Sequence, residues 1–245
     1  LNYRRNVCLM ESPDLVSWSI PRLIFHADEN CVASQADNVA FCTVGNCPVV
    51  FVHLFPVRNI DECLNQYMLP YLATGEDLYH LTTLPDPKPL IGRGSIGSFD
   101  ENMVNIHGAP MNLFDDGRSY FYYCGDSKRS PMSVGLLSFE NNRYCARYGD
   151  EAGGWLLTRE FIVDGSSIEI NAEILPYGEI RAEILDGDHG TARGGRRLAG
   201  YEREIFDPMT VGSLAHTLSW NGSSDISPLK GREVYIRFSR KNAKL

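Results

Sequence analysis

Apolar and charged residues alternate strictly in the C-terminal part of the chain, and this limits the fold more than any other feature. Residues 168–172, 180–184 and 234–238 read Ile-Glu-Ile-Asn-Ala, Ile-Arg-Ala-Glu-Ile and Val-Tyr-Ile-Arg-Phe. Successive side chains of a strand point to opposite faces, so this pattern is typical of strands that bury one face. It predicts strands of one sandwich over 168–185 and 232–239, with these side chains buried: Ile168, Ile170, Ile180, Ile184, Val234, Ile236 and Phe238.

The rest of the chain also favours strands. Residues 49–54 form a compact apolar run, and residues 119–124 are a run of β-formers. Before the second run stands Asp115-Asp116-Gly117, a hairpin signal, because Asp and Gly tolerate the positive φ of short turns. Only residues 61–72 have a helical pattern, and Pro70 limits it. The sequence therefore predicts an all-β protein.

Charge and motifs exclude several classes of protein. The formal net charge of −8 makes nucleic acid an improbable partner for the whole chain. No apolar run approaches the length of a membrane span. There is neither a Gly-rich phosphate loop nor a G-x-S-x-G nucleophile elbow, so we expect neither a nucleotide enzyme nor an α/β hydrolase, and no cofactor. The C-terminal strip is locally basic and is interpreted as the solvated face of strands or, alternatively, as an anion-binding surface: Lys230, Arg232, Arg237, Arg240, Lys241 and Lys244.

The cysteines and one glycosylation motif favour a secreted protein. The chain has seven cysteines, and Cys42 and Cys47 flank a short turn that a disulfide could close. Neither CxxC spacing nor suitable histidine partners are present, so a metal site is a poor interpretation. Asn221-Gly222-Ser223 is an N-glycosylation sequon in a polar turn. Together these features predict a secreted or extracellular protein with a Cys42–Cys47 disulfide and a glycan on Asn221.

The stretch 97–126 holds the candidate site residues. Asp100 and Glu101 are adjacent carboxylates in this stretch, and Glu101 would face the opposite side if the segment were extended. His107 could hydrogen-bond a sugar hydroxyl or orient Asp100, and Asp126 lies at the end of the aromatic run. In the alternative interpretation, Asp100 caps a turn and His107 is a satisfied loop residue.

Several motifs resemble one known group of enzymes. These are the S-x-D-x-x-x-W turn at 12–18, GSFDENMV at 97–104, FYYCGDS at 121–127 and INAEILPYGEIRAEILD at 170–186. They look like the five-bladed β-propeller glycosidases of the invertase, levanase and arabinanase kind. The resemblance implies propeller blades over 1–150 and a C-terminal, jelly-roll-like β-sandwich over 151–245. It also implies a carbohydrate partner. Asp100 stands at the Asp of the group's G-S-W-D-x-G-M-V pattern, which makes it the best single candidate for a catalytic carboxylate, with Glu101, His107 and Asp126 as candidate substrate-binding residues.

The chain also departs from this group. Five blades need about two hundred residues at roughly 40–50 per blade, more than precede the sandwich. We therefore expect the propeller to be incomplete and the chain to be part of a longer protein, completed by its missing portion or by another chain. The group's first-blade nucleophile and its R-D-P and E-C motifs have no clear match. Two functions remain open: a secreted glycoside hydrolase acting on polysaccharide, or a non-catalytic carbohydrate-binding, structural or assembly protein with the same fold.

Overall fold

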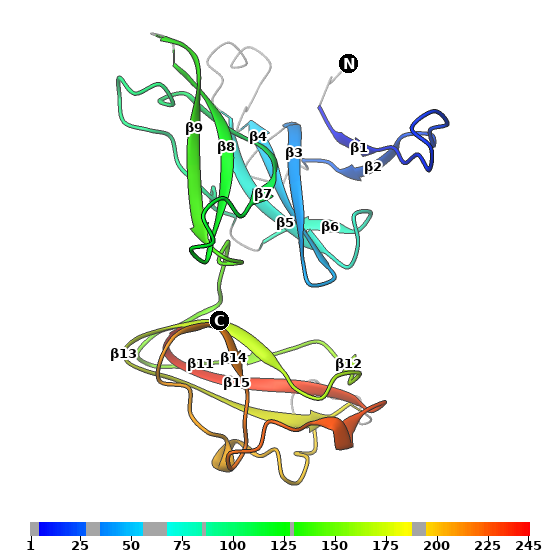
Figure 1. The fold of residues 1–245 in the computed structure, drawn as a ribbon, viewed down its shortest axis with the longest axis vertical. Helices are drawn as coiled ribbons and strands as arrows, with labels where there is room; N and C mark the ends of the chain where they lie inside the picture. Colours follow the sequence, from blue (N-terminus) through cyan, green and yellow to red (C-terminus); the bar gives the residue numbers. More distant parts are fainter. Residues whose placement is uncertain (1–4, 28–34, 56–67, 85–86, 128–129, 188–194) are drawn as a thin grey trace. The chain divides into compact units, whose positions relative to one another are not determined.

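The structure is a computed structural model that describes residues 5–27, 35–55, 68–84, 87–127, 130–187 and 195–245. The chain divides into two compact units, Leu1–Tyr144 and Cys145–Leu245 (Figure 1); the boundary predicted from the sequence lies at 150/151. Both units are built from antiparallel sheets; the described ranges also contain two short 3-10 turns, η2 (Arg203–Ile205) and η3 (Ser227–Leu229). The prediction of an all-β protein is confirmed. Within the described residues no closed barrel or propeller is present.

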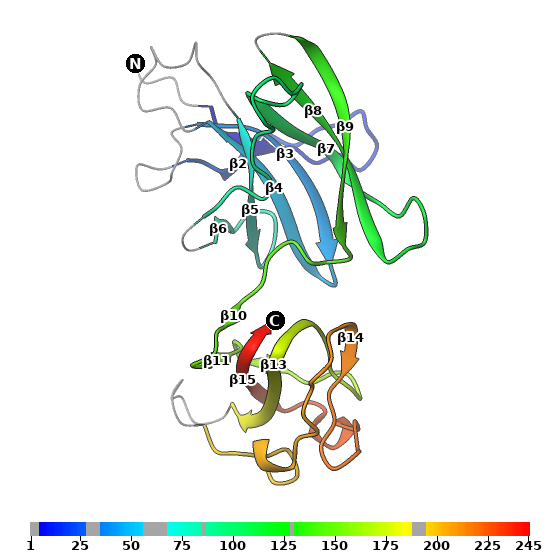
Figure 2. The same ribbon diagram turned by 90° about the vertical axis from the view of Figure 1, so that its left-hand side faces the viewer.

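The first sheet of unit 1 is a four-stranded meander in sequence order (Figure 2). Its strands are β3 (Gln35–Val44), β4 (Cys47–Phe55), β5 (Leu69–Gly75) and β6 (Leu81–Thr83). The predicted apolar strand 49–54 lies within β4 and is almost wholly buried, because β4 is an inner strand of the sheet. A separate two-stranded sheet pairs β1 (Val7–Leu9) with β2 (Arg22–Phe25).

The predicted Cys42–Cys47 disulfide is wrong. The β3–β4 turn pairs Val44 with Cys47 and Cys42 with Val49, so the two cysteines are diagonal rather than opposite. Diagonal neighbours in an antiparallel pair lie roughly 7–8 Å apart, which is beyond ordinary disulfide geometry. The described cysteines are all free thiols: Cys8, Cys42, Cys47, Cys124 and Cys145. Cys31 and Cys63 lie outside the described residues.

The second sheet of unit 1 is a three-stranded meander of β7 (Met103–Met111), β8 (Arg118–Ser127) and β9 (Ser130–Glu140). The predicted turn joins β7 to β8, with Asp115 at φ 50° and Gly117 at φ 73°. The Asp116 carboxylate accepts the backbone N–H of Arg118 at 3.1 Å. The turn prediction is confirmed, and β8 contains the predicted strand 119–124.

A buried histidine joins the two meanders of unit 1. His53, on β4, has no solvent exposure. Its Nε2 accepts the backbone N–H of Ile106 on β7 at 2.8 Å. Nδ1 must therefore carry the proton, which it donates to the carbonyl oxygen of Asn38 on β3 at 3.2 Å. Burial lowers the pKa of His53 to about 4, so the ring is neutral near pH 7. His53 is therefore a packed and fully hydrogen-bonded core residue.

Unit 2 is organised around two long antiparallel strands, β13 (Glu169–Asp186) and β15 (Glu233–Lys244), which run side by side in Figure 1. On the other side of β15 lie β10 (Tyr148–Gly149), β11 (Gly154–Leu157) and β12 (Phe161–Ile162). The beginning of β13 pairs with β14 (Ser213–Thr217). This sheet contains both strands predicted from the alternating pattern.

The two faces of the β13–β15 pair differ as the alternation predicts. One face packs into the core of unit 2, where five of the seven expected side chains are buried: Ile180, Ile184, Val234, Ile236 and Phe238. Ile168 and Ile170 pack against this core but are only partly buried, because they lie at the β14 end of β13, outside the β13–β15 pairing. The opposite face carries charged and polar side chains, including Glu179, Arg181 and Glu183 from β13 and Arg237, Ser239 and Lys241 from β15.

Candidate functional site

Asp100, the predicted catalytic residue, lies in a turn before β7 (the Asp100 turn, residues 94–101). Both carboxylate oxygens are engaged there. Oδ1 accepts the Ser98 hydroxyl at 2.7 Å, and Oδ2 accepts the Tyr123 hydroxyl at 3.0 Å. Burial first, and then the bond to Asp100, raise the pKa of Tyr123 to about 12. Asp100 therefore anchors its own turn to β8.

Two glycines let this turn pack closely. A Cβ on Gly94 would lie 1.9 Å from Oδ1 of Asp100, and one on Gly125 would lie 2.7 Å from the Asp100 Cβ and the Phe99 ring. The rings of Phe99 and Tyr123 stack at 5.8 Å between centroids. Asp100 is thus packed closely against β8, the central strand of this sheet.

The other predicted site residues are not assembled around Asp100. The Glu101 carboxylate accepts the backbone N–H of Gly97 within the same turn. His107 is exposed on strand β7, not in a loop, and lies opposite Tyr122. Asp126 is partly buried on β8 opposite Met103. Within the described residues no hydrogen bond or ion pair joins Asp100 to any of these three, so the geometry favours the turn-capping interpretation of Asp100.

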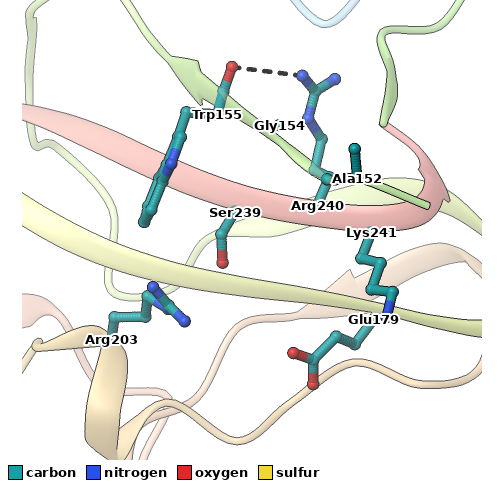
Figure 3. Close-up of a pocket in the computed structure, with 9 residues that line it drawn as sticks. Ala152, Gly154, Trp155, Glu179, Arg203, Ser239, Arg240 and Lys241 are labelled. Atoms are coloured by element: carbon teal, nitrogen blue, oxygen red, sulfur yellow. Dashed lines mark hydrogen bonds between the residues drawn. The ribbon is translucent and has the colours of Figure 1, made fainter. Parts of the chain in front are cut away.

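A pocket of about 450 Å³ lies in unit 2, over the charged face of the sheet and its β11 edge (Figure 3). We call it the Trp155 pocket. Its lining comes from the segment entering β11, from β13, β15 and η2: Ala152, Gly153, Gly154, Trp155, Glu179, Arg203, Ser239, Arg240 and Lys241. The segments are far apart in sequence, and pairing of Trp155 with Ser239 and of Glu179 with Lys241 brings them together.

Trp155 is a large aromatic surface left open at this pocket. Its side chain is 55% exposed, although it stands on a strand of the sheet. The guanidinium carbons of Arg203 and Arg237 each lie 5.2 Å from the Trp155 ring centroid. Arg203 lines the pocket, whereas Arg237 does not. Such cation–π contacts orient the indole while part of it remains accessible to a ligand.

A buried carboxylate holds Arg237 in place beside this ring. Glu183 has no solvent exposure although it belongs to the charged face. Its Oε1 accepts the Nε–H of Arg237 at 2.6 Å. Nε of Arg197 lies 2.9 Å from Oε2 in an ionic contact that lacks hydrogen-bond geometry. Two arginines therefore compensate the buried charge, and one of them fixes Trp155.

Arg240 lies at the pocket, but its side chain extends to the opposite side of β15 from Ser239 and Lys241 (Figure 3). It is 7% exposed, and its guanidinium donates to the carbonyl oxygens of Arg147 at 2.6 Å and Trp155 at 3.4 Å. Figure 3 shows the second of these bonds. Burial, with the charge of Arg147, lowers the pKa of Arg240. Its Nε has no hydrogen-bond partner within the described part of the chain.

The sequon lies on a tight exposed turn. Asn221 and Gly222 have φ of 50° and 76°, which is the pattern of a type I′ turn. The Asp207 carboxylate accepts the Gly222 N–H at 2.7 Å and the Ser219 hydroxyl at 2.6 Å. The Asn221 side chain is thus presented to solvent by a well-supported turn.

The described residues contain neither a metal site nor a membrane-spanning helix. Over the described ranges, no three or more His, Cys, Asp or Glu side chains are grouped so as to hold a metal ion. None of the helical segments described has the length and apolarity to cross a membrane.

Comparisons with known proteins give no assignment. No protein-family model matches the chain, and no curated protein matches it.

Sequence reasoning missed the pocket residues Trp155, Glu179, Arg203 and Ser239. The sequence contains one relevant signal, a large aromatic residue at Trp155 in a short β-like segment. The outward orientation of Trp155 follows only from the pairing of β11 with β15, which the sequence does not show.

Proposed function

We propose that this is an extracellular carbohydrate-binding protein and that the Trp155 pocket holds a sugar. One observation carries the proposal: a half-exposed tryptophan stands beside convergent polar side chains in a pocket of about 450 Å³. The C–H faces of a pyranose ring are apolar and pack on an aromatic ring, while its hydroxyls need donors and acceptors at the rim. Ser239, Glu179 and Arg203 supply such groups.

The proposed fold is that of partial propeller blades followed by a β-sandwich. Support for blades comes from the two sheets of unit 1, each a meander in sequence order, together with the motifs shared with propeller glycosidases. Support for the jelly-roll-like sandwich comes from the core on one face of the β13–β15 pair.

Secretion is part of the same proposal. Its support is the Asn221 sequon on an exposed turn and the carbohydrate ligand itself. The described cysteines add no support, since they are free.

Glycoside hydrolysis is the second candidate and rests on Asp100. Hydrolysis requires two carboxyl groups on either side of the scissile bond, and the bonds of Asp100 to Ser98 and Tyr123 point instead to a structural role. Polysaccharide turnover that is lost in Asp100→Asn would favour the hydrolase. Turnover that is unchanged in Asp100→Asn would remove Asp100 from catalysis.

The decisive test is the loss of one aromatic platform. Trp155→Ala should abolish binding of the full chain in affinity electrophoresis against a polysaccharide panel, because the stacking surface is removed. Trp18→Ala is the matched control, since Trp18 is 52% exposed in unit 1 and should be dispensable. Binding that survives Trp155→Ala, or that is lost equally in Trp18→Ala, would refute the proposal.

A further inference from the structure

We infer that the sugar held by the Trp155 pocket is acidic, and that Lys241 and Arg203 bind its carboxylate or sulfate group. This inference rests on the proposed function and names the class of its ligand. It starts from the charges at the pocket: of the residues that line it, Arg203, Arg240 and Lys241 are cationic and only Glu179 is anionic.

The cations of the basic strip are not equivalent. Three of them form ion pairs with carboxylates of β13: Arg232 with Asp186 at 3.0 Å, Arg237 with Glu183 at 2.6 Å and Lys244 with Glu173 at 2.9 Å. Lys241 has no ion pair or hydrogen bond from its ammonium to any described residue. Three of the six cations of the basic strip are thus neutralised by β13, and two of the other three, Arg240 and Lys241, lie at the pocket, whereas Lys230 does not.

The acidic side chains nearest the pocket already have cationic partners. Glu179 accepts the Nε–H of Arg181, with both oxygens at 3.3 Å. Glu204, next to Arg203 in the chain, is bound by Arg197 at 3.0 Å. The Arg203 guanidinium makes a cation–π contact with Trp155, and its charge also acts on the neighbouring Glu204, but it forms no hydrogen bond or ion pair with a described residue. Its guanidinium hydrogens remain available for a ligand.

Arg240 adds positive potential without being able to approach a ligand freely. Its guanidinium is fixed by two carbonyl oxygens, which leave its charge unneutralised. A carbonyl dipole compensates a cation less than a carboxylate does. On a chain whose formal net charge is −8, such a local concentration of positive charge selects an anion rather than any polar ligand.

The arrangement fits a sugar ring that bears one anionic substituent. Figure 3 shows Trp155, Ser239, Arg203 and Lys241 around the same space. A ring stacked on Trp155 would bring its hydroxyls to Ser239 and its anionic group between the ammonium and the guanidinium. Arg binds carboxylate or sulfate through paired N–H groups, and Lys adds a point charge.

The test compares three oligosaccharides of equal length by isothermal titration calorimetry with the full chain. Oligogalacturonate carries carboxylates, an oligosaccharide of carrageenan carries sulfates, and a cello-oligosaccharide is neutral. We expect tighter binding of one or both acidic oligosaccharides, with affinity that falls as salt rises. Whichever of the two binds identifies the anionic group.

The variant pair is Lys241→Gln and Lys230→Gln. Lys241→Gln should weaken binding of the acidic oligosaccharide roughly tenfold, as expected for one charge-assisted hydrogen bond, and leave the neutral one unchanged. Lys230, exposed and outside the pocket, should be dispensable. Thermal melting of both variants verifies that each is folded.

The outcomes distinguish a failure of the acidic-ligand inference from a failure of carbohydrate binding as a whole. Neutral binding as tight as acidic binding, lost in Trp155→Ala and insensitive to Lys241→Gln, overturns the acidic ligand and leaves carbohydrate binding standing. Equal weakening by Lys230→Gln shows adsorption of polyanions to the surface and also overturns it. Binding of none of the three oligosaccharides, with no binding in the wider polysaccharide panel, overturns both.

Discussion

The Asp100 turn and the Trp155 pocket contain similar chemical groups in opposite states. Each brings an aromatic ring together with charged and hydroxyl side chains. In the Asp100 turn these groups bind one another: Ser98 and Tyr123 occupy both carboxylate oxygens. In the Trp155 pocket the ring is half-exposed and Lys241 is unpaired among the described residues. The comparison teaches that residue type alone does not identify a candidate binding site. The distinguishing feature is whether the polar groups and aromatic rings are already engaged within the protein.

The largest expected effect comes from a core substitution in unit 2, which should unfold the Trp155 pocket and leave the Asp100 turn folded. Ile236 is buried in the core of unit 2, and Ile236→Asp would bury an unpaired charge at a cost of several kcal/mol. Unit 2 should unfold and sugar binding should vanish, while hydrogen exchange shows the Asp100 turn still protected. Ile162→Asp is the control, because Ile162 is 65% exposed. Normal melting of Ile236→Asp would show the assigned register to be wrong, and simultaneous loss of protection in both units would break the comparison.

A smaller effect concerns acid and unit 1. His53 has a pKa of about 4 in the folded protein, against the ordinary 6.5. The unfolded chain therefore takes up the proton first, so the folded state loses stability as pH falls from about 6.5 to about 4. The full loss is about 3 kcal/mol. Urea unfolding between pH 7 and pH 4 should show this slope for the wild type, and His53→Gln should flatten it. Parallel slopes for the two proteins would contradict the assignment.

The smallest effect concerns the packing of the Asp100 turn. Gly125→Ala would place a Cβ 2.7 Å from the Asp100 Cβ and the Phe99 ring, and relieving this overlap should cost about 2 kcal/mol. Gly92→Ala is the matched control, because nothing lies within 4 Å of the added Cβ. Urea unfolding measures both, and sugar binding at the Trp155 pocket should not change. Weaker sugar binding in Gly125→Ala would mean that the two regions are functionally linked.

Local patterns predicted much of the fold. The period-two alternation was sufficient to place β13 and β15 and to assign five buried side chains, because one buried face of a sheet imposes that period. The turn at Asp115 and Gly117 is likewise predicted by a short local motif. Ile168 was misjudged because its burial depends on which strand pairs beside it, and this lies outside the local pattern.

The candidate sites were less predictable because they depend on distant contacts. Asp100 drew attention by its motif, whereas the Tyr123 hydroxyl that occupies it comes from the next strand. Trp155 became a candidate only after β11 paired with β15 and η2 brought Arg203 to its ring. The Cys42–Cys47 disulfide failed for a related reason: closeness in sequence did not specify the diagonal arrangement of the two residues across the hairpin.

The buried Glu183 has a consequence for how β13 and β15 align. A slip of one residue between these strands would turn Glu183 toward the hydrophobic core and Ile184 toward the charged face. Arg237 would lose its carboxylate, and an unpaired charge would enter an apolar interior. The Glu183–Arg237 ion pair therefore favours the observed register between β13 and β15 over a register shifted by one residue. The carboxylate that supports the Trp155 ring also penalises misfolding of the sheet on which the ring stands.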